Sequence, residues 1–405
     1  MNQSKKTKYK VTKYGFLLLV LAVYSLWALF RPLALITPST KVMQLQSSTL
    51  ASKLVWPSTG QAAVGITPSG VLAVHGIQKP LPIASTAKVL TALCVLKKKP
   101  LGRDQKGPTI VLTDADVKIF NDYVAGDGSV TPVSAGQSLS EYQMLQAVLL
   151  PSANNIADSL AIWAFGSLNN YSTFANGYIR QLGLTNTHVG SDASGYDPTT
   201  VSTAHDLVLL GEAAMQEPVL AAIVGQKSAE LPYVGSIYNV NKLLGTNDIV
   251  GIKTGNTDQA GGVFLGAKTV EVGGKQLVII SAVVGSTDLY AAMTTSVPLL
   301  ASAKQNFAST TVLKAESVVG HYSTPWGAEA SASTLKRLDA VAWKGSTVPT
   351  EVTLQPVSGN TKPGQVVGTI TVPASTVSAA QQVPVVLDFA LSRPSAWWRL
   401  THPTN

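Results

Sequence analysis

The alternation of hydrophobic and polar positions divides the chain into parts of different character. Residues 14–30 form an uncharged apolar run that follows five lysines, a pattern that predicts a membrane-spanning helix. Between about residues 59 and 306, runs with strand periodicity and runs with helix periodicity both occur, which predicts a mixed α/β (α+β) fold. From about residue 307, short Val- and Thr-rich runs alternate with Gly, Pro and Ser, which is typical of an all-β domain.

The strand-like runs lie at both ends of the mixed part. Two of them surround a Thr-Pro-Ser-Gly turn and predict a hairpin, and Gly273-Gly274 predicts a second turn. Because helix-like segments separate the front strands from the back strands, we expect one antiparallel sheet flanked by helices, with a helical insertion. The predicted strands cover residues 62–76, 248–255, 261–272 and 275–285, and a closing helix covers about 287–305.

Helix-start and helix-stop signals organise the insertion. Residues 84–97 are almost wholly apolar or small and predict a buried helix. Residues 138–141 (Ser-Leu-Ser-Glu) fit a capping box, which begins a helix that Pro151 ends, and another helix follows at once. Residues 203–206 are a weaker start signal for a further helix. Residues 102–137 are polar and contain glycines, so we expect loops and short strands there.

Composition and charge narrow the class of protein. The chain has 405 residues, of which 13% are charged, and a formal net charge of +8. Six of the 30 lysines and arginines lie in residues 1–31, which contain no acidic residue, so the rest of the chain is nearly neutral. The basic balance therefore belongs to the N-terminus and does not indicate a nucleic-acid-binding face. Lysines on one side of the apolar run predict that this side is cytoplasmic.

Two interpretations of the N-terminal run are open. A cleaved signal peptide has an apolar core of roughly 7–15 residues and a small-x-small cleavage site, whereas an anchor needs about 17–25 residues. No convincing cleavage site follows Phe30, so we favour an uncleaved anchor, and either interpretation places the remaining chain outside the cytoplasm. The predicted organisation is a cytoplasmic tail (1–13), a transmembrane anchor (14–37), a linker (38–58), the mixed domain (59–306), a β-sandwich domain (307–392) and a tail (393–405).

The helix predicted at residues 84–97 carries the first candidate chemistry. Lys88 lies three positions after Ser85, so the two side chains share one face of the helix. Burial disfavours the charged form of lysine, and fully buried lysines titrate down to about 5–6. Lys88 is therefore a candidate general base for a Ser85 nucleophile. The competing interpretation is a lysine whose side chain extends to the surface, and the S-x-x-K spacing alone does not exclude it.

Two further triplets strengthen this interpretation. Residues 152–154 (Ser-Ala-Asn) lie between two predicted helices, and alternate side chains of an extended tripeptide face one pocket. Residues 253–255 (Lys-Thr-Gly) end a predicted strand and offer a cation, a hydroxyl and a position that a ligand can approach closely. Each triplet alone is more often an ordinary helix break or strand end. All three motifs, in this order and in these contexts, form a specific signal.

The sequence indicates no metal or cofactor chemistry. Cys94 is the only cysteine, so no internal disulfide is possible, and its apolar surroundings predict a small buried side chain. The five histidines show no metal-ligand spacing. We therefore expect no metal site and no cofactor.

The three motifs resemble those of the serine D-alanyl-D-alanine carboxypeptidases, the low-molecular-mass penicillin-binding proteins. The resemblance extends to the blocks "PIASTAKVLTAL", "LLPSANNIADSLA" and "NVNKLLGTNDIVGIKTGNTDQAGGVFLGAK", and to "TKPGQVVGTITV" in the β domain. It implies a β-lactamase/transpeptidase-like fold for the catalytic domain, residues 59–306. It also implies removal of the terminal D-alanine from peptidoglycan stem peptides through an acyl-enzyme, with β-lactam antibiotics as covalent inhibitors.

The resemblance implies a role for each matching residue. Ser85 is expected to form the acyl-enzyme, with Lys88 as its base and Ser152 relaying a proton to the leaving amine. The expected substrate-binding residues are Asn154 (peptide backbone), Lys253 (electrostatics), Thr254 (terminal carboxylate), Gly255 (close approach) and Asn256 (oxyanion hole, with the backbone N–H of Ser85).

Three alternatives share parts of this pattern. A β-lactamase commonly carries a Glu-x-x-Leu-Asn loop, and no glutamate between residues 155 and 252 stands in such a pattern. A transpeptidase or endopeptidase uses the same acyl-enzyme chemistry, so the sequence does not separate them from a carboxypeptidase. A catalytically silent wall-binding protein is expected to lose a motif residue, and none is lost. The favoured interpretation is a carboxypeptidase of cell-wall maturation, outside the cell membrane.

Overall fold

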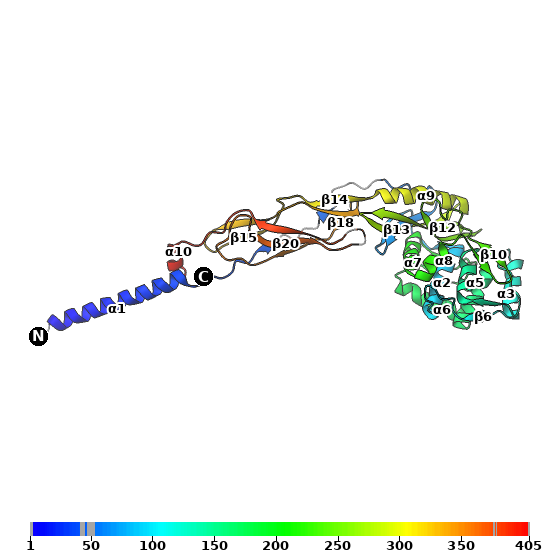
Figure 1. Ribbon diagram of the computed structural model, residues 1–405, viewed down its shortest axis with the longest axis horizontal. Helices are drawn as coiled ribbons and strands as arrows, with labels where there is room; N and C mark the ends of the chain where they lie inside the picture. Colours follow the sequence, from blue (N-terminus) through cyan, green and yellow to red (C-terminus); the bar gives the residue numbers. More distant parts are fainter. Residues whose placement is uncertain (1–2, 41–44, 47–52, 376, 378, 404–405) are drawn as a thin grey trace. The chain divides into compact units, whose positions relative to one another are not determined.

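The computed structural model describes residues 3–40, 45–46, 53–375, 377 and 379–403. The chain divides into two compact units, which are coloured along the sequence in Figure 1. The α/β unit comprises Ala51–Ala308, and the β unit joins Met1–Leu50 to Ser309–Asn405. The domain boundaries drawn from the sequence stay predictions, and each unit is described by itself.

The α/β unit contains the expected five-stranded antiparallel sheet, in the order β11-β12-β13-β3-β4. Its front and back strands meet where β13 pairs with β3, with Ile280 opposite Gly65. The prediction of one sheet built from both ends of this part of the chain is therefore confirmed. The strands are β3 (Gln61–Thr67), β4 (Gly70–His75), β11 (Ile249–Thr257), β12 (Gly261–Val272) and β13 (Lys275–Ser286).

Helices cover both faces of this sheet. Figure 1 shows α9 on one side of β12 and β13, and α7 with the helices of the insertion on the other side. A continuous apolar core joins the sheet to these helices. The helices are α2 (Ala87–Lys98), α3 (Asp114–Ala125), α4 (Glu141–Leu149), α5 (Asn154–Phe165), α6 (Leu168–Gln181), α7 (Ala204–Gln216), α8 (Pro218–Val224) and α9 (Leu289–Gln305).

Two local predictions within the insertion are wrong. The capping box of α4 uses Ser140 and Gln143, not Ser138 and Glu141, because residues 138–140 pair as strand β7 (Ser138–Ser140) before the helix begins. The polar region 102–137 contains helix α3, which Thr113 begins through a capping box. None of the residues of α3 is fully buried, so this helix lies at the surface of the unit.

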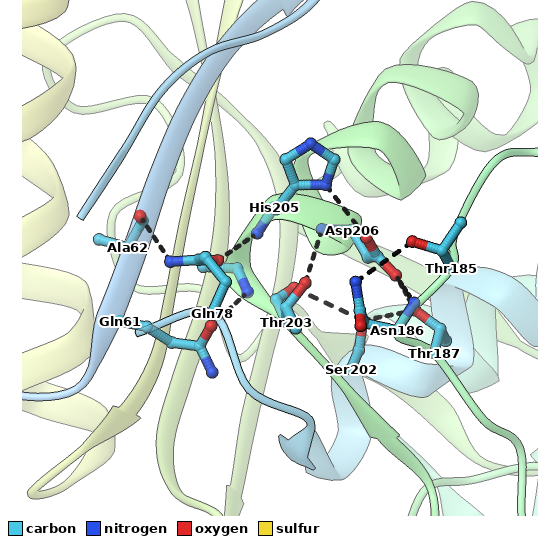
Figure 2. A network of polar contacts seen from close by, with 11 residues as sticks. Gln61, Ala62, Gln78, Thr185, Asn186, Thr187, Ser202, Thr203, His205 and Asp206 are labelled. Atoms are coloured by element: carbon cyan, nitrogen blue, oxygen red, sulfur yellow. Dashed lines mark hydrogen bonds and ion pairs between the residues drawn. The ribbon is translucent and has the colours of Figure 1, made fainter. Parts of the chain in front are cut away.

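A polar network fixes the start of α7 (Figure 2). Thr203 is the N-cap, as the sequence predicts, and accepts a hydrogen bond from the backbone N–H of Asp206 at 3.1 Å. The buried Asp206 carboxylate accepts a hydrogen bond from the backbone N–H of Asn186 at 2.7 Å. The backbone N–H of His205 donates to Gln78 Oε1 at 2.9 Å. The network ties α7 to the chain that follows α6 and to the chain that follows β4.

The described residues between 307 and 392 form strands and loops only, as the prediction of an all-β domain requires. A six-stranded antiparallel sheet has the order β1-β15-β16-β21-β20-β19, and the pairs β14–β17 and β18–β2 complete the unit around one core of Val, Ala and Leu side chains. The strands are β1 (Ser39–Thr40), β2 (Leu45–Gln46), β14 (Phe307–Leu313), β15 (Val318–Ser323), β16 (Glu329–Thr334), β17 (Leu338–Trp343), β18 (Thr347–Val348), β19 (Glu351–Leu354), β20 (Val366–Val372) and β21 (Gln381–Leu387).

Part of the predicted linker, residues 38–58, belongs to this β unit. β1 pairs with β15, and β2 pairs with β18. Residues 41–44 and 47–52 of the predicted linker lie outside the described residues. Residues 39–40 and 45–46 therefore contribute strands to the β unit, whereas residues 53–58 belong to the α/β unit.

The N-terminal helix α1 (Gln3–Phe30) is long and apolar enough over Lys13–Phe30 to cross a membrane. It ends at Phe30 because the residue before a proline, here Arg31 before Pro32, disfavours helical geometry. The short C-terminal helix α10 (Ala396–Thr401) packs on α1 within the same unit. Arg399 Nη1 donates to the carbonyl of Leu29 at 2.8 Å, and so satisfies one of the acceptors that a helix end leaves free.

Candidate active site

The turn that carries Ser85 leads directly into a helix. Ser85 lies in a single 3₁₀ turn, Ala84–Thr86, and α2 begins at the next residue. This continuity places Lys88 one turn after Ser85 on the same face, with 2.6 Å between Lys88 Nζ and Ser85 Oγ. Ala84, directly before the serine, has a φ of +45°, in the left-handed region that a residue with a Cβ rarely adopts. The backbone is therefore strained beside the candidate nucleophile.

Lys88 is fully buried, with 0% of its surface exposed. Its Nζ also lies 2.7 Å from Asn154 Oδ1 and 3.2 Å from the carbonyl oxygen of Ser194. Burial lowers the pKa of Lys88 from 10.5 to about 7, although the negative charges of Asp192 and Asp158 partly oppose this effect. Near pH 7, Lys88 is therefore neutral in a substantial fraction of the molecules, and in these it is able to accept a proton. The interpretation of a surface-seeking lysine is excluded by this burial.

The second motif approaches the site from the start of α5. Ser152 has a φ of +68° and is not extended, so the prediction of an extended tripeptide is wrong. Asn154 is the first residue of α5, and its side chain contacts Lys88. The Ser152 hydroxyl is buried and lies 2.8 Å from Lys253 Nζ. The left-handed backbone at Ser152 thus lets neighbouring residues contact two different lysines.

The third motif lies on the edge strand β11. Lys253 is 1% exposed, and its Nζ also donates to the carbonyl of Thr254 at 3.1 Å. Burial, followed by the positive charge of Lys88, lowers the pKa of Lys253 well below its ordinary value. A Cβ at Gly255 would lie 2.8 Å from the carbonyl oxygen of Ile83. The missing side chain therefore makes room for the turn that carries Ser85, which packs directly on this strand.

A cleft of about 540 Å³ opens in front of Ser85. Its walls come from three places: the chain after α3, the segment around residues 195–198 and the turn between β11 and β12. Polar groups predominate among the lining residues, which suits a peptide rather than an apolar ligand. The lining residues are Ser85, Gly126, Asp127, Gly128, Ser129, Asn154, Gly195, Tyr196, Asp197, Pro198, Asn256, Thr257, Asp258 and Gln259.

The structure brings the three motifs together around this cleft. Ser85, Lys88 and Asn154 form one hydrogen-bonded group, and Ser152 with Lys253 forms a second. Of the remaining predicted residues, Thr254 is buried on β11, Gly255 packs on the serine turn, and Asn256 lines the cleft. The individual roles assigned to these residues stay predictions.

The three sequence motifs do not include the buried acidic residues near Lys88, or the tyrosine that binds one of them. Asp158 and Asp192 are both buried, and Tyr123 donates a hydrogen bond to Asp158 Oδ2 at 2.8 Å. One signal was available: Asp158 follows Asn154 by four residues, so both lie on one face of α5. Asp192 and Tyr123 are far from the motifs along the chain, and no spacing rule connects them to Lys88.

Comparison with known proteins agrees with this geometry. The profile of the D-alanyl-D-alanine carboxypeptidase family (Peptidase_S11) matches residues 59–287. D-alanyl-D-alanine carboxypeptidase DacB2 of Mycobacterium tuberculosis is 35% identical over 204 residues, which cover 49% of this chain and 65% of that protein. D-alanyl-D-alanine carboxypeptidase DacC of Escherichia coli is 28% identical over 336 residues, which cover 78% of this chain and 80% of that protein.

The fold is also found among solved structures. Penicillin binding protein 5 from Haemophilus influenzae matches with a TM-score of 0.59 and 19% sequence identity, over 85% of this chain and all of that chain. At this identity the match shows a shared fold. The predicted β-lactamase/transpeptidase-like fold class is thereby confirmed.

Proposed function

The chain belongs to the D-alanyl-D-alanine carboxypeptidase family, and from this membership we propose that it removes the terminal D-alanine from peptidoglycan stem peptides. One observation carries the proposal for this chain: Lys88 is fully buried, and its Nζ lies 2.6 Å from Ser85 Oγ. A serine beside a lysine that is partly neutral at pH 7 is an activated nucleophile. The family's reaction requires such a nucleophile.

In the proposed acylation step, neutral Lys88 accepts the proton of the Ser85 hydroxyl. Ser85 Oγ then forms a bond to the carbonyl carbon between the two D-alanines, and negative charge develops on the carbonyl oxygen. The proposed donors to this oxygen are the backbone N–H groups of Ser85 and Asn256. Removing one donor of this kind typically costs about 2.7–4 kcal/mol of transition-state stabilisation.

The carbon–nitrogen bond breaks next. The leaving D-alanine needs a proton on its amine, and we assign its delivery to Ser152, whose hydroxyl lies 2.8 Å from Lys253 Nζ. Water then attacks the ester carbonyl on Ser85, which releases the shortened stem peptide and restores the hydroxyl. No atom outside the chain, the substrate and water is required.

The proposed substrate contacts use polar groups of the second and third motifs. Asn154 Oδ1 is occupied by Lys88, so its amide nitrogen is the group proposed to hold a carbonyl of the stem peptide. Thr254 and Lys253 are proposed to bind the terminal carboxylate, the first by its hydroxyl and the second by electrostatic attraction, since a carboxylate beside Lys253 favours the charged form of this lysine. Asn256 lines the cleft together with Ser85 and is proposed to contact the scissile peptide.

We propose that β-lactam antibiotics acylate the same serine. A β-lactam presents a strained amide carbonyl, and Ser85 attack opens the ring while the new amine stays attached to the adduct. The family binds this class of inhibitor, so a stable penicillin adduct reports directly on the nucleophile. The adduct also separates the function from that of a β-lactamase, which hydrolyses it rapidly.

We further propose that α1 is an uncleaved membrane anchor, which places the α/β unit outside the membrane. Its window Lys13–Phe30 is long and apolar enough to span the bilayer. The contacts with α10 support retention of the helix, because cleavage after Phe30 removes the Leu29 carbonyl that Arg399 binds. Tyr24 also donates a hydrogen bond to the Leu400 carbonyl at 2.6 Å. A mature protein that begins near residue 35 would contradict this assignment.

The decisive experiment uses a stem-pentapeptide mimic that ends in D-Ala-D-Ala. The purified full-length chain is expected to release free D-alanine, whereas Ser85→Ala is expected to release none. Ser228→Ala, a change at an exposed serine on β9 (Ser228–Leu231), serves as the matched control and should act as the wild type does. Equal release from Ser85→Ala would disprove the assignment of the nucleophile.

The same preparation separates the remaining alternatives. An acyl donor supplied with an amine acceptor distinguishes transfer from hydrolysis, and cross-linked stem dimers test endopeptidase action. Penicillin that turns over quickly instead of accumulating on Ser85 would indicate a β-lactamase. A folded protein that shows neither D-alanine release nor penicillin attachment would indicate a silent wall-binding protein.

A further inference from the structure

A short segment, Asp192–Asp197, contacts both α2 and α5 and is called the strap. The Asp192 carboxylate shapes it by accepting hydrogen bonds from the backbone N–H groups of Ser194 and Gly195, each at 2.6 Å, and of Asp197 at 2.5 Å. One carboxylate thus holds three successive parts of the strap in a tight turn. The far part of the strap, residues 195–197, forms one wall of the cleft.

Helices α2 and α5 hold the near part of the strap from two sides. From α2, Lys88 Nζ lies 3.2 Å from the Ser194 carbonyl, and Thr91 Oγ1 donates to the Ala193 carbonyl at 2.6 Å. From α5, Asp158 Oδ1 accepts the backbone N–H of Ala193 at 2.8 Å. Both polar groups of the Ala193 residue are therefore fixed, and the next carbonyl along the chain contacts the proposed base.

The strap also touches the turn that carries the nucleophile. Gly195 has a φ of +74°, and a Cβ at this position would lie 2.2 Å from the carbonyl oxygen of Ala84. No side chain fits there, so the strap backbone packs directly against the residue that precedes Ser85. The strap therefore contacts both Lys88 and the turn that carries Ser85.

The second oxygen of Asp158 connects the strap to the opposite wall of the cleft. Asp158 Oδ2 accepts the Tyr123 hydroxyl at 2.8 Å, and the Tyr123 oxygen lies 3.4 Å from Ser194 Oγ. The Tyr123 ring packs edge to face on Tyr196, with 5.6 Å between ring centroids. Tyr196 donates its hydroxyl to the carbonyl of Gly126 at 2.5 Å. One buried carboxylate thus holds α5, the strap and the end of α3 together.

We propose that Asp158 is a positioning residue for the reaction: by holding the Ala193 amide and the Tyr123 hydroxyl, it fixes the strap against Lys88 and the Ser85 turn. This inference rests on the proposed function, because it assigns a role in the same acylation step. It adds a residue outside the three sequence motifs. A misplacement of about 1 Å in a reacting group costs up to about 10²-fold in rate, so the position of the strap matters for acylation.

The charge of Asp158 gives this role a second readout. Ionised Asp158 raises the pKa of Lys88, as does Asp192, against the larger effect of burial. Burial and the charge of Asp192 raise the pKa of Asp158 itself to about 7. Removing the Asp158 charge therefore lowers the pKa of Lys88 and raises the activity around pH 7, where part of the wild-type Asp158 is ionised. The ionisable groups that face this pair are Asp192 of the strap, Tyr123 of α3, Tyr171 of α6 and Lys253 of β11.

Two variants at position 158 separate position from charge. Asp158→Asn keeps an oxygen for the Ala193 amide and offers an N–H to the Tyr123 oxygen, but it carries no charge. Asp158→Ala removes both contacts. The rate of Ser85 acylation by a fluorescent penicillin is measured from pH 5.5 to 9 and divided by the folded fraction, with Asp122→Asn at an exposed position of α3 as the control.

The expected results differ for each variant. Asp158→Ala slows acylation about 10-fold or more at every pH. Asp158→Asn restores most of the acylation rate, and the pH below which this rate falls (the acid limb of the profile) is lower by about half to one pH unit than in the wild type. Tyr123→Phe keeps the ring, loses the hydroxyl and is expected to fall between Asp158→Ala and the wild type. Wild-type rates per folded molecule in Asp158→Ala, with an unmoved acid limb in Asp158→Asn, would overturn the proposal. A wild-type protein that is itself not acylated would instead overturn the proposed function.

Discussion

The two units differ in what they bury. In the described part of the β unit, the buried polar side chains are all Ser or Thr, set in a core of Val, Ala and Leu. The α/β unit also has a continuous apolar core, but among its described residues it buries six side chains of Lys, Asp or Glu. They are Lys88, Glu141, Asp158, Asp192, Asp206 and Lys253.

The positions of these six residues explain the difference. Asp206 holds the start of α7, and Glu141 is the first residue of α4. The other four surround the Ser85 turn through the contacts of the two lysines and the strap. Burying a charged group is unfavourable unless partners compensate for the lost water. The β unit contains no such groups among its described residues, whereas the α/β unit keeps most of them where the proposed reaction requires shifted pKa values.

The largest effect is expected from removing the buried base. Lys88→Ala should lower the rate of Ser85 acylation by about 10²–10⁴-fold, the usual contribution of a positioned general base. The change leaves Asn154 Oδ1 and the Ser194 carbonyl without their donor, so near pH 10, where folding no longer has to neutralise Lys88, a loss of about 1–3 kcal/mol in unfolding free energy is also expected. Stopped-flow acylation and urea unfolding measure the two effects. Acylation at the wild-type rate would remove Lys88 from the mechanism.

A pair of matched core substitutions tests whether the units carry separate tasks. Ile280 on β13 and Ile370 on β20 are both fully buried, and Ile→Ala at such a site typically costs 2–5 kcal/mol. Ile280→Ala should lower the temperature at which penicillin acylation is lost. Ile370→Ala should lower the melting temperature of the β unit and leave acylation unchanged. The reverse pattern would show that the stability of the β unit controls the site.

The pH dependence follows from the direction of the Lys88 shift. The neutral lysine is the active form, so acylation should fall about tenfold per pH unit below about pH 7 and level off above it. The free energy of unfolding changes in the same direction. Between about pH 7 and pH 10.5 the unfolded chain binds more protons at Lys88 than the folded chain, so the contribution of Lys88 to the free energy of unfolding rises with pH. Chemical unfolding of the wild type and Lys88→Met from pH 6 to 10 measures the difference. An identical pH dependence in both proteins would contradict it.

The smallest effect is expected in the β unit, at the contact between its terminal helices. Arg399→Ala removes the hydrogen bonds to the carbonyls of Leu29 and Arg31, at 2.8 and 3.0 Å. Hydrogen exchange of the α10 amides should become faster, with a cost of about 1–3 kcal/mol to the local contact. Acylation of Ser85 should not change. Unaltered exchange would show that these hydrogen bonds do not hold α10 in place.

Local patterns were sufficient for most of the fold. The turn between β3 and β4 and the Gly273-Gly274 turn each have a sequence signature, and the strands beside them alternate or run apolar as buried strands do. Helix α3 was missed because polar, Gly-containing segments surround it, although Val117, Phe120 and Val124 recur at helical spacing within it. The N-cap of α4 was misplaced by two residues because the strand β7 extends to Ser140.

The candidate site also has a part that local sequence patterns predict and a part that only the packing of distant segments creates. Ser85 and Lys88 are three residues apart, and helix geometry alone brings them together. Asp158 and Ser194 are 70 and 106 positions from Lys88, so only the packing of α2, α5 and the strap brings them close. The motif residues were therefore predictable, and the buried carboxylates that tune them were not.

The pairing of β1 with β15 and of β2 with β18 has a consequence for synthesis on the ribosome. All of the α/β unit lies between these partners along the chain, so it can emerge and fold as one contiguous piece. The β unit must wait for nearly the last hundred residues before its first strands find their neighbours. A ribosome that stalls after it has made the α/β unit would hold a nascent chain in which the α/β unit is folded and the β unit is not.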